Sequence, residues 1–392
     1  MFDIVSLKGG LENVDGFYFD GVHAGFKNSG QNDLGFIRSD EPFLVSKLFT
    51  TNKFKAAPLE HALKYPIGFR SNFILLNSKN ANAMTSEEGI KDIDKILSFV
   101  PLNLVNPLMS STGVIGERLN TSKIIQALSK FNWQNRDSNA VANSIMTTDS
   151  FKKELAFRVE LENGKSFNIA AICKGAGMIN PSMATMLCYI LTDAKIPQND
   201  ADELLECAVK NSFNAVSVDG DTSTNDTVML FSSALKVYDK KAFKTALEMM
   251  TLNLALMLLK DGEGSSKVVT YDITGATSDE DAEIVAKKLS NSLLVKTALF
   301  GEDPNWGRIA STIGASGVLC DANRLVIKYD DVLVYDNEHT QLDQEREKRA
   351  HQVMQKESFK ISCDLGLGDG KFCAYGCDLG HKYIDINSSY RS

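Results

Sequence analysis

A helix that is apolar nearly all the way round has to be covered by other parts of the protein. Residues 241–260 predict such a helix, and their richest apolar stretch is 252–259. We expect the helix to end at Asp261-Gly262, because glycine can adopt the left-handed conformation that stops a helix. The apolar stretch is too short to span a bilayer, so we interpret it as a core helix and expect no membrane contact. A chain with such a helix is expected to fold in layers.

Composition fits an ordinary globular protein. The chain has 392 residues, enough for two lobes, with 43% apolar and 23% charged residues. Its net charge of -8 argues against a nucleic-acid-binding protein but allows a local cationic pocket for a small charged substrate. The N-terminus lacks a secretory signal, and the seven scattered cysteines lack metal-site spacing. We therefore expect a cytoplasmic protein with reduced cysteines in its core and no metal site.

Strand-like and helix-like stretches alternate along the chain, which predicts an α/β protein. The texture changes near residue 275, so we expect a main lobe over residues 1–275 and a smaller α/β lobe over 276–392. No linker marks the boundary, and we expect the lobes to pack closely. The expected strands are 73–77, 186–191 and 293–300 and a hairpin of 324–329 with 332–335; the expected helices are 200–214, with Asp200 as N-cap, 279–290 and 343–356.

The most unusual segment is 174–187, which starts as a glycine-rich turn, passes Pro181 and enters an apolar strand at Met186. Thr185 lies where the irregular loop enters the strand, a place where a backbone bond can be held under strain. Cutting the bond between Ala184 and Thr185 would free an α-amine with a pKa of about 7.7–8.0. That amine could then serve as the base for the hydroxyl of its own residue. Taken alone, a threonine at a strand start is a structural residue.

This segment resembles the self-processing motif of the glutamate N-acetyltransferase (ornithine acetyltransferase) family of arginine biosynthesis. The resemblance covers almost the whole chain, and its motifs are highly specific when taken together and in order. Besides the segment above, the matching residues are 21–27, 49–53, 80–83, 111–116, 146–149, 261–264, 300–308, 376–379 and 387–392.

The resemblance implies a layered αββα sandwich like that of N-terminal-nucleophile enzymes, with a smaller C-terminal α/β lobe whose tail returns to the active site. It implies self-cleavage after Ala184, which would give chains 1–184 and 185–392. These fragments would stay together, and the family's usual assembly is an α2β2 heterotetramer.

The implied reaction moves an acetyl group from N2-acetylornithine to glutamate through an acetyl ester on Thr185, which predicts ping-pong kinetics. No metal or organic cofactor is needed, while acetyl-CoA as a second acetyl donor is left open by the sequence. Thr112 and Gly113 match the family's oxyanion hole, which stabilises the negative oxygen formed during acyl transfer. The implied substrate-binding residues are Thr148, with Thr147 as the alternative, Lys174, Thr185, Glu263, Asn387 and Ser392.

Three residues depart from the family pattern. Lys79 stands where glycine is common, which suggests a changed turn because lysine tolerates positive φ poorly. Ala176 replaces a common serine, which suggests altered processing efficiency. Ser392 replaces threonine and keeps its hydroxyl but loses the methyl group that stiffens the side chain.

Two other functions stay open at this point. A self-processed N-terminal-nucleophile aminopeptidase would share the fold and would use water to release the acyl group, so it would hydrolyse peptide amides without glutamate. A non-enzymatic binding protein that had lost processing would purify as one intact chain. The intact Thr185 and the oxyanion pair Thr112 and Gly113 argue against the second of these.

Overall fold

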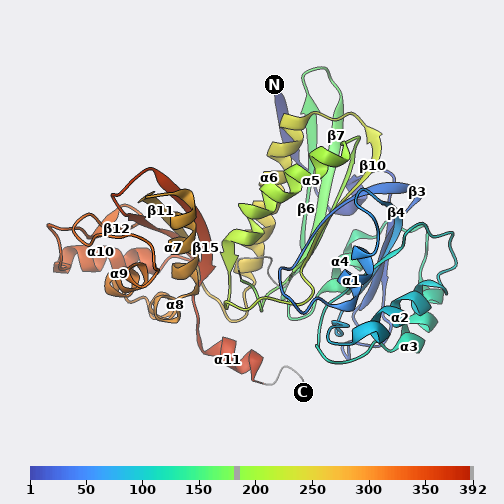
Figure 1. Ribbon diagram of the computed structural model, residues 1–392, viewed down its shortest axis with the longest axis horizontal. Helices are drawn as coiled ribbons and strands as arrows, with labels where there is room; N and C mark the ends of the chain where they lie inside the picture. The colour runs from blue at the N-terminus through green and yellow to red at the C-terminus, as the bar shows by residue number, and fades with distance from the viewer. Residues whose placement is uncertain (181–185, 389–392) are drawn as a thin grey trace. The chain divides into compact units, whose positions relative to one another are not determined.

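The computed structural model describes residues 1–180 and 186–388 (Figure 1). The chain divides into two compact units. The first unit comprises residues 1–175, 185–212 and 222–254, and the second comprises 176–184, 213–221 and 255–392. The division near residue 254 precedes the expected boundary near 275, because β11 (Val268–Ala276) lies inside the sheet of the second unit.

The first unit is built on a nine-stranded sheet. Strands β8 and β10 are parallel neighbours, and their first residues, Leu187 and Thr227, are paired. Met186, just before β8, therefore lies beside Asp226, just before β10. The strand order is β1 (Phe2–Ser6), β6 (Lys153–Leu161), β7 (Ser166–Lys174), β8 (Leu187–Ala194), β10 (Thr227–Lys236), β3 (Leu34–Phe49), β4 (Arg70–Asn77) and β5 (Leu108–Ser111), with β2 (Tyr18–Val22) paired to β3.

The sheet of the first unit folds over on itself, so that one face of each half points into a shared apolar core. Tyr189 and Phe231 from one half meet Phe43 and Ile74 from the other. On the outer face of β3, β4 and β5 lie α2 (Ser86–Leu97) and α3 (Thr121–Ala127), and on the outer face of the other half lie α5 (Gln198–Lys210) and α6 (Lys240–Lys260) (Figure 1). This is the expected helix–sheet–sheet–helix layering, with the two sheet layers continuous through β10 and β3. The remaining elements are η1 (Leu11–Asn13), α1 (Ala57–Leu63), η2 (Leu128–Lys130) and α4 (Ser138–Ile145).

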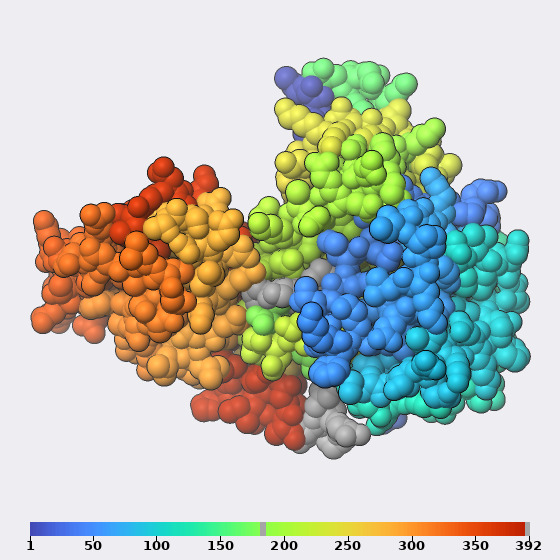
Figure 2. Space-filling view, in the orientation of Figure 1, coloured from blue at the N-terminus to red at the C-terminus, as the bar shows by residue number. Residues whose placement is uncertain are grey.

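Helix α6 is a core helix with one face open. Phe243 and Leu254 are fully buried, whereas Met249 is 41% exposed. Figure 2 shows α5 and α6, in yellow-green and yellow, at the surface. The prediction of an enclosed helix is therefore wrong. Gly264, with a φ of 74°, adopts the left-handed conformation after the helix, and Gly262 does not.

By length and composition, α6 is the one described helix that could cross a bilayer, although core helices of soluble proteins meet the same criterion. The stretch 252–259, which is too short to span a bilayer, is part of this longer helix. The apolar side chains on its buried face pack within the protein, as the contact of Phe243 with Phe167 on β7 illustrates.

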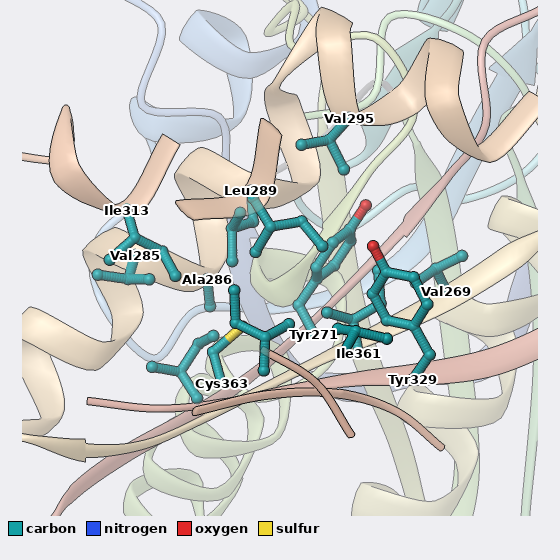
Figure 3. Packing of buried hydrophobic residues seen from close by; sticks show 14 of the residues in the cluster. Val269, Tyr271, Val285, Ala286, Leu289, Val295, Ile313, Tyr329, Ile361 and Cys363 are labelled. Atoms are coloured by element: carbon teal, nitrogen blue, oxygen red, sulfur yellow. The ribbon is translucent and has the colours of Figure 1, made fainter. Parts of the chain in front are cut away.

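The second unit has a six-stranded sheet whose core is shown in Figure 3. Tyr271 and Ile361 from the sheet pack against Val285 and Leu289 of α7 and against Ile313 of α9. The strand order is β13 (Val332–Tyr335), β12 (Val326–Tyr329), β14 (Ser358–Asp364), β11, β15 (Gly370–Cys377) and β9 (Val216–Ser217); the helices are η3 (Phe213–Ala215), α7 (Asp279–Asn291), α8 (Leu293–Phe300), α9 (Trp306–Gly314), α10 (Gln344–Met354) and α11 (His381–Asn387).

Most local predictions are confirmed: β4, β8, α7, α10 and the β12–β13 hairpin all lie where expected. The predicted strand 293–300 is wrong, because these residues form α8, and the Ser292 side chain caps it by accepting the N–H of Val295. An apolar run of eight residues does not distinguish a buried strand from a helix. Asp200 is not the N-cap of α5, which begins after Pro197; its carboxylate accepts from Tyr238 and Lys240 instead.

Candidate active site

The start of β8 is held by backbone and side-chain hydrogen bonds. The N–H of Met186 donates to Asp226 Oδ1 at 3.2 Å, and the Met186 carbonyl accepts the N–H of Thr227 at 3.0 Å. The expected cleavage-site residues Ala184 and Thr185 lie outside the described residues, as does Ser392. Met186, the residue that follows Thr185 in the sequence, is therefore held in place by both of its backbone polar groups.

Thr112, which is buried, and Gly113, which is half-buried, follow directly after β5. The Thr112 N–H donates to the Asn77 carbonyl at 3.1 Å. Gly113 has a φ of 137°, and a Cβ there would lie 2.1 Å from the carbonyl carbon of Lys79. Only glycine fits so close an approach at this φ. The sequence predicted this pair, and the structure places it against the 77–80 turn.

Lys79 has a φ of 74°, so it occupies the left-handed conformation that glycine favours. The expectation that lysine would change this turn to avoid a positive φ is therefore wrong. The Val114 N–H donates to the Lys79 carbonyl at 3.2 Å and helps to hold the conformation. A left-handed non-glycine residue costs about 1–2 kcal/mol. The turn under Gly113 is thus kept at some cost in backbone strain.

Asn225 connects the Thr112 turn to the start of β10. Its Nδ2 donates to the Ser111 carbonyl at 2.8 Å and to the Ala81 carbonyl at 2.6 Å. Strand β10 pairs with β8 from Thr227 onward. The Asn225 side chain therefore connects Ser111, the residue before Thr112, to the start of the β8–β10 pair. Sequence analysis missed Asn225; the polar run 222–227 before an apolar strand was the available signal.

Lys174 is the last residue of β7, and its side chain is fully buried. Its Nζ donates to Thr147 Oγ1 at 3.2 Å, so Thr147, the alternative to Thr148, contacts this lysine. Burial lowers the pKa of Lys174, while the nearby Asp149 carboxylate acts to raise it. A lysine in a buried position is suited to receive a substrate carboxylate that replaces its lost hydration.

Asp149 organises the residues around Lys174. Its carboxylate pairs with Lys153 Nζ at 2.7 Å, with both side chains fully buried. It also accepts the N–H of Gly175 at 2.7 Å and that of Thr147 at 3.0 Å. Burial acts to raise the pKa of Asp149, but the charges of Lys153 and Lys174 outweigh it and the pKa is lowered. Asp149 is the last residue of the matching motif 146–149, and no role was predicted for it from the sequence.

In the second unit, Glu263 lies beside the C-terminal helix. Its Oε2 accepts Asn387 Nδ2 at 2.8 Å, and its N–H donates to the Ala176 carbonyl at 2.9 Å. A Cβ on Gly177 would lie 2.4 Å from Glu263 Oε2, so a larger residue there would displace the Glu263 carboxylate. Glu263 and Asn387, which the sequence places far apart, are therefore brought into direct contact.

Asp219 holds the backbone that leads toward the expected cleavage site. Its carboxylate accepts the N–H groups of Met178, at 2.6 Å, and Ile179, at 2.9 Å, and the hydroxyl of Tyr383 at 3.2 Å. Burial raises the pKa of Asp219, and these hydrogen bonds oppose the rise. The same carboxyl thus connects segment 176–180 to α11.

The expected site residues form two groups: Thr112, Gly113, Thr148 and Lys174 in the first unit, and Glu263 and Asn387 in the second. Within residues 1–180 and 186–388, no group of three or more His, Cys, Asp or Glu side chains is arranged to hold a metal ion. All seven cysteines are free, but Cys207 is exposed and Cys320 and Cys373 are half-buried. The expectation that cysteines fill the core therefore holds for the other four.

The chain is similar to known proteins over nearly its whole length. The model of the ArgJ family matches residues 18–392. The arginine biosynthesis bifunctional protein ArgJ of Wolinella succinogenes is 54% identical over 396 residues, and the match covers 100% of this chain and 100% of the relative. That of Geobacter sulfurreducens is 38% identical, covering 97% of this chain and 100% of the relative. The crystal structure of the Bacillus halodurans protein of that name is 33% identical, with a TM-score of 0.48, and covers 52% of this chain and 98% of that one.

Proposed function

We propose that this chain, which belongs to the ArgJ family, uses Thr185 to move an acetyl group from N2-acetylornithine to glutamate. It is an acyltransferase of arginine biosynthesis. The observation that carries the proposed site is the Asn225 side chain. It binds the Ser111 carbonyl next to Thr112 and stands at the start of the strand pair that follows Thr185.

In the first half-reaction, the Thr185 hydroxyl attacks the acetyl carbonyl and its proton passes to the α-amine of the same residue. A pKa of about 7.7–8.0 leaves that amine partly neutral near pH 7, so it can accept the proton. The amide bond then breaks, ornithine leaves with the proton, and the acetyl group stays on Thr185 as an ester. In the second half-reaction, the glutamate amine attacks the ester and the proton returns to the threonine oxygen.

Thr112 and Gly113 would stabilise the oxyanion of each tetrahedral intermediate. Their turn is rigid, because Gly113 is packed on the Lys79 backbone and the Thr112 N–H is donated to the Asn77 carbonyl, so the proposed donors are the Thr112 hydroxyl and the Gly113 N–H. Donors that are already in place need no reorganisation during the reaction, and one such donor is typically worth about 3–4 kcal/mol. Rigidity of this turn supports the proposal.

Substrate charges have matching partners. Lys174, buried with its Nζ on Thr147, would bind a substrate carboxylate. Glu263, held by Asn387, would bind a substrate ammonium, with Thr148 and Ser392 as the further proposed contacts. Charge-assisted hydrogen bonds of this kind are stronger than neutral ones.

Processing and assembly follow from the same proposal. Self-cleavage after Ala184 would yield chains 1–184 and 185–392, assembled as an α2β2 heterotetramer in the cytoplasm. The ornithine cycle needs no metal or organic cofactor, because the acetyl donor is itself a substrate. We do not favour the aminopeptidase alternative, because the family match and the relatives in arginine biosynthesis support transfer to an amino acid.

A second activity is proposed on a separate observation: the relatives are named bifunctional. We propose that acetyl-CoA can also acetylate Thr185, so that free glutamate becomes N-acetylglutamate. Purified protein would be incubated with acetyl-CoA and glutamate. Absence of N-acetylglutamate above a blank without enzyme would remove this second activity and leave the first intact.

Intact mass spectrometry tests the acetyl-threonine step. With acetylornithine and no glutamate, the fragment beginning at Thr185 is expected to become one acetyl group heavier. Addition of glutamate is expected to remove that group within one turnover. Steady turnover with no acetylated fragment at any time would contradict the covalent mechanism.

A further inference from the structure

Asp226 is a fully buried carboxyl group just before β10, and neither the sequence motifs nor the proposed chemistry uses it. Its Oδ1 accepts the backbone N–H of Met186 at 3.2 Å. Its Oδ2 is shielded from solvent and makes no hydrogen bond of ordinary geometry with residues 1–180 and 186–388, although the hydroxyls of Thr50 and Ser223 act on the carboxyl. A carboxyl oxygen that is buried without a hydrogen bond is costly to hold in its charged form.

The position of Asp226 links it to the proposed nucleophile. Met186, whose N–H it accepts, is the residue bonded to Thr185 in the sequence. The neighbouring Asn225 holds the Ser111 carbonyl at 2.8 Å, and the neighbouring Thr227 donates to the Met186 carbonyl at 3.0 Å. Three successive residues therefore fix the backbone on both sides of the proposed chemistry.

The surroundings favour the uncharged form of this carboxyl. Burial raises the pKa of Asp226 well above its ordinary value; the Met186 N–H, the charge of Lys174 and the hydroxyls of Thr50 and Ser223 act against the rise without cancelling it. Lys174, on β7, is the charged side chain that faces Asp226, and the Asp149 carboxylate also acts on that lysine. An ionised Asp226 would offset the positive charge that Lys174 offers to a substrate.

An ionised Asp226 would also act on the proposed base, because the N–H that it accepts belongs to the residue bonded to Thr185 in the sequence. A negative charge within about 4–6 Å of an amine favours the ammonium form and typically raises the amine pKa by about 1–3 units. An α-amine that is protonated near neutral pH cannot accept the threonine proton. A carboxyl group that holds the backbone without a charge avoids this effect.

We propose that Asp226 is a positioning residue that works as an uncharged carboxylic acid: it fixes the backbone after Thr185 through the Met186 N–H, and its second oxygen carries a proton. This inference rests on the proposed role of Thr185. The group makes and breaks no bond of the transferred acetyl. Its ionisation switches the site off, because the negative charge then raises the pKa of the amine, which keeps a proton taken from solvent, and offsets Lys174.

The test compares Asp226→Asn with Asp226→Ala. Asparagine is uncharged, has nearly the same shape, and can both accept the Met186 N–H and donate from its second position. We expect Asp226→Asn to keep self-cleavage and acetyl transfer within about threefold of wild type, and Asp226→Ala to slow both at least about tenfold, a loss of one hydrogen-bonding group. Circular dichroism would establish that each variant is folded.

A pH profile provides the readout that a purely structural role would not change. Wild-type transfer is expected to rise as the amine loses its proton and to fall again at higher pH as Asp226 ionises. Asp226→Asn is expected to keep the rise and lose the fall. In addition, the infrared difference spectrum between wild type and Asp226→Asn at pH 7 should contain the C=O band of a protonated carboxylic acid.

The outcomes separate this inference from the proposed function. If wild type neither cleaves nor transfers acetyl groups, the proposed function fails. If wild type does both and Asp226→Asn is as inactive as Asp226→Ala, the carboxyl has to ionise and the inference is wrong. The same conclusion follows if the protonated-acid band is missing, or if Asp226→Ala behaves like wild type. Should Asp226→Ala not fold, the Asp226→Asn profile and spectrum decide alone.

Discussion

Replacement of Asp149 by asparagine tests the role of the buried charge beside Lys174. The change removes a carboxylate that pairs with Lys153 Nζ at 2.7 Å, and both side chains are fully buried. Breaking a buried ion pair by removing one partner typically costs about 3–5 kcal/mol. For a unit of about 150–250 residues, each 1 kcal/mol shifts Tm by about 2–4 °C, so we expect Tm to fall by about 6–20 °C.

Differential scanning calorimetry would measure this loss against two matched variants. Lys91→Met removes a partner from the exposed Glu88–Lys91 pair and should leave Tm unchanged. The double variant Asp149→Asn with Lys153→Met should recover part of the loss, because the buried charge of Lys153 is then removed together with that of Asp149. The reasoning is refuted if Asp149→Asn lowers Tm no more than Lys91→Met does.

The pH dependence of this stabilisation has a defined sign. The folded pKa of Asp149 is lowered, so its contribution is full above the unfolded pKa of about 3.9 and is lost as the pH falls through the folded value. The difference in Tm between wild type and Asp149→Asn should therefore be constant near neutral pH and shrink in strong acid. A difference that stayed constant down to pH 2 would contradict the ionised state assigned to Asp149.

Three further substitutions have defined outcomes. Gly113→Ala should lower kcat by about 10²–10³, the loss expected for one oxyanion donor, because its Cβ would collide with the Lys79 backbone; wild-type kcat would contradict the proposed oxyanion turn. Lys79→Gly should raise the free energy of unfolding by about 1 kcal/mol through relief of the positive φ, and urea denaturation showing no gain would argue against the strain. Asn387→Ala should raise KM more than it changes kcat, because it frees Glu263 Oε2; an unchanged KM would remove Asn387 from the substrate site.

Local sequence patterns predicted the elements whose signals are local. The helix α10 follows the N-cap Asp343, and the β12–β13 hairpin follows from two apolar strands around Asp330, which takes a positive φ of 49°. Residues 293–300 were misassigned because an apolar run fits either a helix or a buried strand, and the decisive Ser292 cap is a single residue. Which face of α6 is covered depends on tertiary packing, and the spacing of apolar residues in the sequence does not show it.

The site was predicted from motifs, and its supporting residues were not. Thr112, Gly113, Lys174 and Glu263 were found by resemblance, whereas Asp149 and Asp226 resemble ordinary turn or capping acids in the sequence. Their importance appears only when folding buries them and places them on Lys174, Gly175 and Met186. A carboxylate without a compensating partner is costly to bury, and sequence spacing alone does not reveal where its partners lie.

The proposed mechanism depends on a free amine at Thr185, and N-terminal sequencing after denaturing electrophoresis tests it most directly. Wild-type protein is expected to give two bands of similar size, one of which begins at Thr185. Thr185→Ala is expected to give one full-length, inactive band, whereas Thr185→Ser, which keeps the hydroxyl and the amine, should retain both cleavage and some activity. An active protein that runs as a single uncleaved chain, or a Thr185→Ala variant as active as wild type, would contradict the account.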